Sequence, residues 1–168
     1  KELAFEMFDL IGDRRRVLEG NSSLGYTPQT ALADLIDNSI ANNAEIVRID
    51  IMKVVGGKLS VTVSDDGDGM SPDKLKEAMA FGSSKDLIGN DLSKFGFGMK
   101  AASMSISKSG FTVYTRSVDE EESAAAIELE DQSGSGHLQG RFYSDPHPRF
   151  RSHLDKTSLN GSGTLVIW

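Results

Sequence analysis

Hydrophobic and polar residues alternate along this chain with two periods, and the two periods predict different elements. Apolar residues recur at spacings of three and four, which predicts helices over residues 1–20, 28–42, 72–80 and 98–107. A period of two predicts a pair of antiparallel strands around the tight turn Gly56-Gly57, with one buried and one polar face. Further strands are predicted over 111–117, 124–130 and 164–168, and the stretch 131–162 reads as irregular.

The helix over residues 28–42 has the clearest pattern. Thr27 followed by Pro28 is a typical helix start. The residues that form its predicted apolar face are Leu32, Leu35, Ile36, Ser39 and Ile40. At about 100° per residue, Asp34 and Asn38 project from the opposite side, one turn apart.

The order of these elements predicts the fold. Two helices, two strands, two more helices around a glycine-rich loop, and then strands indicate an α/β two-layer sandwich. We expect one mixed, mostly antiparallel sheet covered on one face by helices. Residues 1–168 fit a single domain, and because the chain begins at Lys1 rather than Met, we expect it to be part of a longer protein.

Composition narrows the functional classes. The chain has no cysteine, which excludes disulfides and thiolate metal sites and fits a reducing intracellular compartment. Its formal net charge of -7 argues against a broad DNA-binding face. No apolar run reaches the roughly 18 residues that a membrane span needs, so we expect no membrane association.

Three short motifs carry candidate chemistry. The acidic turn Asp65–Gly69 follows a strand, where a carboxylate can accept hydrogen bonds from a flat ligand that approaches the glycine backbone. Gly96 and Gly98 precede a helix, whose free N–H groups can hold phosphate oxygens. An amide such as Asn38 can complete a Mg²⁺ shell, and Asp34 can polarise a water. Taken alone, the acidic turn, the glycines and the Asp34/Asn38 pair are also explained by an ordinary surface turn, a flexible loop and two solvated side chains.

Together and in this order, the motifs resemble those of the ATPase superfamily shared by the DNA gyrase B subunit, heat-shock chaperones, histidine kinases and MutL (GHKL, the Bergerat fold). The resemblance runs from about Gly25 to Trp168 and rests on D-x-x-x-N, D-x-G-x-G, the glycine-rich loop and a Gly-Thr before the last strand. The segments "ALADLIDNS", "DDGDGMSPDKL", "FGSSK" and "GTLVIW" are most similar to the microrchidia (MORC) branch.

The resemblance implies an ATP site, with roles assigned by matching each motif. Asn38 matches the Mg²⁺ ligand, Asp65 the acceptor for the adenine amino group, and Asp34 the water-activating residue. Residues 82–97 match the ATP lid. The remaining implied nucleotide contacts are Gly67, Gly69 and Met70 around the base, Gly96, Phe97, Gly98 and Met99 at the phosphates, Thr164 beside Asp65, and the lysines Lys85 and Lys100.

One departure leaves the activity open. The superfamily usually carries glutamate where this chain has Asp34, which is shorter by one methylene, or about 1.5 Å of reach. The leading expectation is slow, Mg²⁺-dependent ATP hydrolysis that drives lid closure and homodimerisation as a clamp, with a DNA or protein client bound through other domains. Alternatives are an ATP-binding switch with negligible hydrolysis, a histidine-kinase catalytic domain, and an α/β domain that binds no nucleotide.

Overall fold

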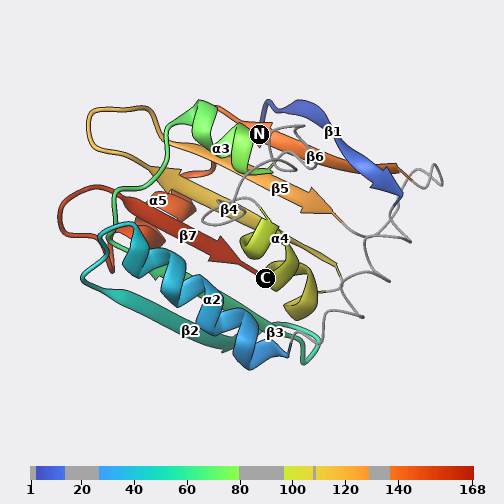
Figure 1. Ribbon diagram of the computed structural model, residues 1–168, viewed down its shortest axis with the longest axis horizontal. Helices are drawn as coiled ribbons and strands as arrows, with labels where there is room; N and C mark the ends of the chain where they lie inside the picture. The colour runs from blue at the N-terminus through green and yellow to red at the C-terminus, as the bar shows by residue number, and fades with distance from the viewer. Residues whose placement is uncertain (1–2, 14–26, 80–96, 108, 129–136) are drawn as a thin grey trace.

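A seven-stranded antiparallel sheet organises the fold (Figure 1). The computed structural model describes residues 3–13, 27–79, 97–107, 109–128 and 137–168. The sheet has the order β1-β6-β5-β4-β7-β3-β2, and all six neighbouring pairs are antiparallel. Its strands are β1 (Glu6–Asp13), β2 (Val47–Lys53), β3 (Leu59–Asp65), β4 (Gly110–Arg116), β5 (Ser123–Glu128), β6 (His137–Tyr143) and β7 (Gly163–Ile167).

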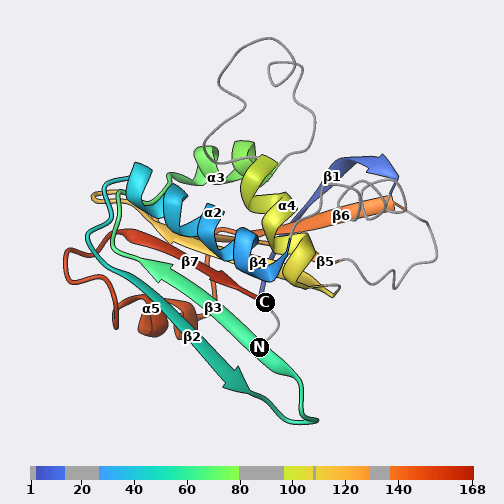
Figure 2. The same cartoon turned by 60° about the horizontal axis from the view of Figure 1, so that its bottom comes forward.

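Helices cover both faces of this sheet, unequally (Figure 2). The helices α2 (Pro28–Ala41), α3 (Pro72–Met79) and α4 (Phe97–Ile106) pack on one face around a core that includes Leu35, Leu75 and Val166. The short α5 (Pro148–Leu154) packs on the other face, against Tyr114 and Leu165. The predicted α/β fold is confirmed, and α5 adds cover that the sequence did not predict. No helix in the described ranges is long and apolar enough to cross a membrane.

The start of α2 follows the sequence signal. Thr27 is the N-cap, and it exchanges hydrogen bonds with Thr30 through both backbone amides (2.9 and 3.2 Å). Pro28 occupies the first turn, where its missing N–H costs nothing. This reciprocal capping fixes where the helix begins.

The buried face of α2 differs from the predicted one. The buried residues are Ala31, Leu35 and Ser39, whereas Ile40 is 60% exposed. Asn38 lines a pocket together with Leu35 and Ser39, so it lies beside the buried stripe and not opposite to it. The prediction was right for Leu35 and Ser39 and wrong for Ile40 and Asn38, because periodicity within one helix cannot show which part of the apolar stripe contacts the rest of the protein.

The predicted β2–β3 hairpin is confirmed, and its register runs from Val47 opposite Asp65 to Lys53 opposite Leu59. Gly56 and Gly57 form its turn, with φ of +86° and +77°. Its expected buried face is wrong along most of β2, because Ile51 is 63% exposed. Figure 2 shows the reason, since the turn end of the hairpin projects beyond the helices that cover the rest of the sheet.

Two stretches were predicted wrongly, and they pair with each other. The helix expected within residues 1–20 is instead strand β1, at least over Glu6–Asp13, and the irregular stretch 131–162 contains β6 and α5. Glu6 pairs with Phe142, and the ring of Phe8 lies directly over Gly140. Each strand is therefore stabilised by a partner more than 100 residues away, and this tertiary pairing overrides the local helical spacing.

Candidate functional site

A buried carboxylate, Asp65, lies at the end of β3 and is 8% exposed. Its Oδ1 accepts hydrogen bonds from the backbone amides of Gly67 (3.0 Å) and Thr164 (3.2 Å). Its Oδ2 accepts one from the hydroxyl of Ser39 (2.8 Å). Burial raises the pKa of Asp65, and these three hydrogen bonds partly offset that rise. The carboxylate is thus held in one orientation by three separate segments.

Asp65 opens into a pocket between α2, α4 and the sheet. The predicted residues Asn38, Met70 and Met99 contribute to the same pocket, as does Thr164. The remaining lining is mainly apolar and comes from Leu35, Ser39, Val63 and Val166. Five predicted site residues from five different segments therefore meet at one cavity. An apolar lining with a few fixed polar groups is the usual character of a small-molecule site.

The glycines of the acidic turn are required by the packing of the chain itself. At Gly67 a Cβ atom would lie 2.6 Å from the carbonyl oxygen of Asn42. At Gly69, where φ is +67°, it would lie 2.0 Å from the carbonyl oxygen of Arg116. The sequence explained these glycines by a close ligand, and contact between them and a base stays a prediction.

The two other carboxylates of the turn bind the connection between α2 and β2. Asp66 Oδ1 accepts hydrogen bonds from the amides of Glu45 (2.9 Å) and Ile46 (2.7 Å). Asp68 Oδ2 accepts one from Asn43 Nδ2 (2.7 Å). The three carboxylates therefore have different roles, because Asp65 lines the pocket whereas Asp66 and Asp68 hold the α2–β2 connection.

Thr115 fixes the turn against the central strand and was not predicted. This fully buried residue on β4 donates from Oγ1 to the carbonyl oxygen of Gly163 (3.0 Å) and accepts from the amide of Met70 (2.8 Å). Its hydroxyl also lies 3.3 Å from that of Thr164. A single threonine in a strand gives no sequence signal, and its importance appears only through the pairing of β4 with β7.

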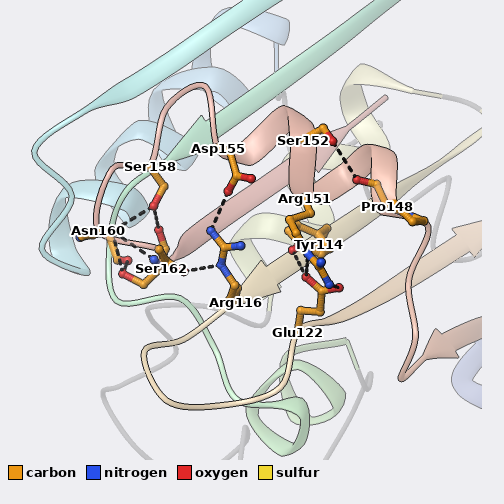
Figure 3. A network of polar contacts seen from close by, with 12 residues as sticks. Tyr114, Arg116, Glu122, Pro148, Arg151, Ser152, Asp155, Ser158, Asn160 and Ser162 are labelled. Carbon is orange, nitrogen blue, oxygen red and sulfur yellow. Dashed lines mark hydrogen bonds and ion pairs between the residues drawn. The ribbon is translucent and has the colours of Figure 1, made fainter.

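The segment after α5 also contacts this turn, and Figure 3 shows Arg116, Asp155, Asn160 and Ser162 in and around that segment. Ser162 Oγ donates to the carbonyl oxygen of Gly67 (2.7 Å), and Asn160 Nδ2 donates to that of Asp66 (3.1 Å). Arg116 holds this segment through Asp155 (2.8 Å) and through the carbonyl oxygen of Gly161. The loop predicted as irregular is thus a supporting layer beneath the pocket.

The residues predicted at the phosphate end are described only in part. Asp34 is half-buried on α2, one turn before Asn38, and does not line the described pocket. Phe97 and Gly98 form the first residues of α4, and Lys100 is 3% exposed. Lys85, Gly96 and the lid of residues 82–97, apart from Phe97, lie outside the described residues.

The donor chemistry fits a magnesium ion that a nucleotide brings with it. Within the described ranges, no three His, Cys, Asp or Glu side chains gather as a metal cluster. Asn38 offers one hard carboxamide oxygen at the pocket, and Mg²⁺ commonly takes one or two protein ligands together with phosphate and water oxygens.

Known proteins resemble this chain in sequence. The profile of the family described as histidine kinase-, DNA gyrase B-, and HSP90-like ATPase matches residues 26–153. Among individual relatives, Protein MICRORCHIDIA 3 of Arabidopsis thaliana is 34% identical over 103 residues, which is 59% of this chain and 17% of that protein.

Two further relatives match shorter stretches. MORC family CW-type zinc finger protein 1 of Mus musculus is 38% identical over 84 residues, 46% of this chain and 9% of that protein. DNA mismatch repair protein MutL of Paramagnetospirillum magneticum is 37% identical over 70 residues, 42% of this chain and 11% of that protein. The matched stretches thus span less than a fifth of each of these three relatives, and the resemblance to the MORC branch and MutL is confirmed.

Proposed function

The chain belongs to the histidine kinase-, DNA gyrase B-, and HSP90-like ATPase family, and from this premise we propose that it binds and hydrolyses ATP with Mg²⁺. Family membership supports ATP binding. The observation that carries the proposal is the position of Asp65, whose oriented carboxylate lies in the same apolar pocket as Asn38. Among the described residues, Oδ2 accepts only the hydroxyl of Ser39, so one lone pair is left for a ligand donor.

The pocket supplies the two features that an adenine base needs. Met70 and Met99 present polarisable apolar surface, and Val63 and Val166 complete the lining on the sheet side. In the proposed complex, Asp65 Oδ2 accepts the hydrogen bond of the adenine amino group. A guanine base carries a carbonyl at that position, and two facing acceptors would repel each other. The proposal therefore includes preference for adenine over guanine nucleotides.

The phosphate end is proposed to lie between α2 and the start of α4. The first amides of a helix and its dipole favour phosphate oxygens, and α4 begins at Phe97. The carboxamide oxygen of Asn38 would hold the magnesium ion, which supplies charge neutralisation when it is bound. Asp34 would accept the proton of the attacking water at its carboxylate.

A nucleotide switch with negligible turnover is the second candidate. Two observations favour it: Asp34 does not line the described pocket, and its side chain is shorter than that of glutamate. A histidine-kinase activity has less support. His147 caps α5 and His153 lies within it, and α5 packs on the sheet face opposite the pocket.

Two measurements on the full chain separate these candidates. Calorimetric titration with Mg·ATP measures binding, and steady-state phosphate release measures turnover. We expect Asn38→Ala to weaken Mg·ATP binding and Asp34→Ala to abolish release while binding persists. Asp37→Ala, on the exposed side of the same helix, is the matched control. Turnover unchanged in Asp34→Ala refutes the assigned base, and absent binding of Mg·ATP refutes the whole proposal.

We extend the proposal to an intracellular, ATP-driven clamp that dimerises on lid closure and acts on a DNA or protein client. The name of the MutL relative connects that protein with DNA mismatch repair. Sedimentation with and without a non-hydrolysable ATP analogue tests the dimerisation, since a clamp should associate more strongly when nucleotide is bound.

A further inference from the structure

Strand β2 forms an open edge of the sheet, and no described element lies beyond it (Figure 1). In its register with β3, Val54 N donates to Lys58 O (2.8 Å), and Ile46 O accepts from Asp66 N (3.3 Å). Because hydrogen-bonding groups alternate in direction along an antiparallel strand, even-numbered residues bond to β3. The N–H and C=O groups of the odd-numbered residues, from Val47 to Lys53, therefore point outward.

This edge lacks most of the features that prevent strand pairing. It contains no proline, and its only lysine is the terminal Lys53. Ile49 and Ile51 are 39% and 63% exposed, and Met52 is 47% exposed. The two internal charges neutralise each other, since Arg48 Nε lies 2.9 Å from Asp50 Oδ2. Among the described residues, the outer edge of β2 is thus unpaired, and exposed apolar side chains lie along the strand.

We propose that two copies of this chain pair through β2, antiparallel and centred on Ile49. With Ile49 opposite itself, Arg48 of each copy faces Asp50 of the other, and Val47 faces Ile51. The next pairs are Ile46 with Met52 and Glu45 with Lys53. Every position therefore meets a partner of matching character, apolar against apolar and charge against opposite charge, which is the condition for stable cross-strand pairs.

The neighbouring registers are worse for a specific reason. Residues whose backbone N–H and C=O groups point outward must face each other across the interface. The alternative registers therefore differ in which residue lies on the symmetry axis, and neighbouring registers move that residue by one position. Centring on Arg48 or on Asp50 places that residue opposite its own copy, and identical charges directly opposite are destabilising. Centring on Ile51 places Asp50 opposite Met52. Only the register centred on Ile49 pairs both charges twice.

A charge-reversal experiment without nucleotide tests this interface separately from ATP-driven association. Sedimentation equilibrium of the wild-type chain should show a monomer–dimer equilibrium. Arg48→Asp alone and Asp50→Arg alone should each raise the dimer Kd about tenfold or more, because two favourable charge pairs become two repulsive ones. Each variant should keep its Mg·ATP binding, since neither residue lines the pocket. Each should also stay folded, because the contacts that it loses, between Arg48 and Asp50 and between Asp50 and His153 (3.4 Å), are partly exposed and contribute little to the free energy of unfolding.

Complementation makes the test decisive. A mixture of the two single variants should form a heterodimer, because the two acidic side chains of the Arg48→Asp strand then face the two basic side chains of the Asp50→Arg strand. The double variant Arg48→Asp/Asp50→Arg should recover the homodimer. A purely structural effect of either substitution on β2 would not be rescued by mixing. Absence of rescue, or a wild-type chain that stays monomeric at high concentration, overturns the proposal.

A cysteine cross-link provides a second readout, because the chain has no cysteine of its own. Facing residues of a hydrogen-bonded antiparallel pair have Cα atoms about 5.5 Å apart, within the range that a disulfide spans. Ile49→Cys should therefore form a disulfide-linked dimer on mild oxidation. Val55→Cys, at the fully exposed turn of the hairpin, is the control and should remain largely monomeric. Equal cross-linking of both variants contradicts the proposed register.

Discussion

Replacing Asp65 by asparagine separates binding from folding at the centre of the proposed site. The side chain keeps its shape, so its Oδ1 still accepts from the amides of Gly67 and Thr164. The new Nδ2 can donate to the hydroxyl of Ser39. The one hydroxyl hydrogen of Ser39, shared in the native chain between Asp65 Oδ2 (2.8 Å) and the carbonyl oxygen of Leu35 (3.1 Å), then points to Leu35 alone. The number of internal hydrogen bonds is therefore unchanged.

The charge of Asp65 itself does not stabilise the fold at neutral pH. Burial raises its pKa above the ordinary 3.8, so the native state binds the proton more tightly than the unfolded state does. The free energy of unfolding therefore falls as pH rises from 3.8 through the raised pKa, and the cost is complete above it. Asparagine removes this cost, and we expect the free energy of unfolding to change by no more than about 1 kcal/mol.

Ligand affinity should respond in the opposite way. An amide N–H₂ in place of the carboxylate presents a donor to the adenine amino group, and the charge-assisted hydrogen bond is lost. Such a bond is worth about 1.5–3 kcal/mol, so the Kd for Mg·ATP should rise roughly 10- to 150-fold. Isothermal titration calorimetry measures this change, and chemical denaturation measures stability on the same samples.

The adjacent residue provides the matched control. Asp66 is also a carboxylate that accepts hydrogen bonds from two backbone amides, but its side chain does not line the pocket. Asp66→Asn therefore removes a comparable charge outside the site. It should leave Mg·ATP affinity within about twofold of wild type, because only local hydrogen bonds change. A folded Asp65→Asn chain that binds Mg·ATP as tightly as wild type refutes the assignment of Asp65.

Three further outcomes are expected. Mg·ATP affinity should rise with pH through the raised pKa of Asp65, since the ionised form is the acceptor; a flat pH profile of calorimetric Kd values over that range would contradict this. Gly69→Ala should lower the free energy of unfolding in urea by about 3 kcal/mol or more, because φ is +67° and the new Cβ would lie 2.0 Å from a carbonyl oxygen. Gly57→Ala is the control, since its φ is +77° but no atom lies near the new Cβ, and it should cost about 1–2 kcal/mol. Thr115→Val should lower the free energy of unfolding by about 2–4 kcal/mol in the same assay, because it removes two hydrogen bonds and leaves the buried amide of Met70 unpaired. A decrease below about 0.5 kcal/mol would contradict the role of Thr115 in holding the turn.

Elements with local signals were predictable from sequence. The start of α2 is encoded by Thr27 and Pro28, and the hairpin by Gly56-Gly57 between alternating residues. These signals act within a few positions of the backbone that they shape. The edge strand β1 and its neighbour β6 have no such signal, because their pairing joins residues from opposite ends of the chain.

The candidate site divides in the same manner. Asn38, Asp65 and Thr164 could be proposed because they occur in ordered motifs, and the structure brings them to one pocket. Ser39 and Ser162 could not, since each is a single polar residue whose partner is set by the packing of distant segments. Motifs therefore reveal candidate ligand contacts, whereas the residues that hold them in place require the tertiary structure.

The central position of β7 has a consequence for biosynthesis. Within the sheet, only this strand joins the half formed by β1, β6, β5 and β4 to the hairpin of β2 and β3. Residues Gly163–Ile167 must therefore leave the ribosomal exit tunnel before the two halves can unite. Until that moment the pocket of a nascent chain lacks the side that Thr164 and Val166 supply, and the chain exposes apolar surface that β7 later covers.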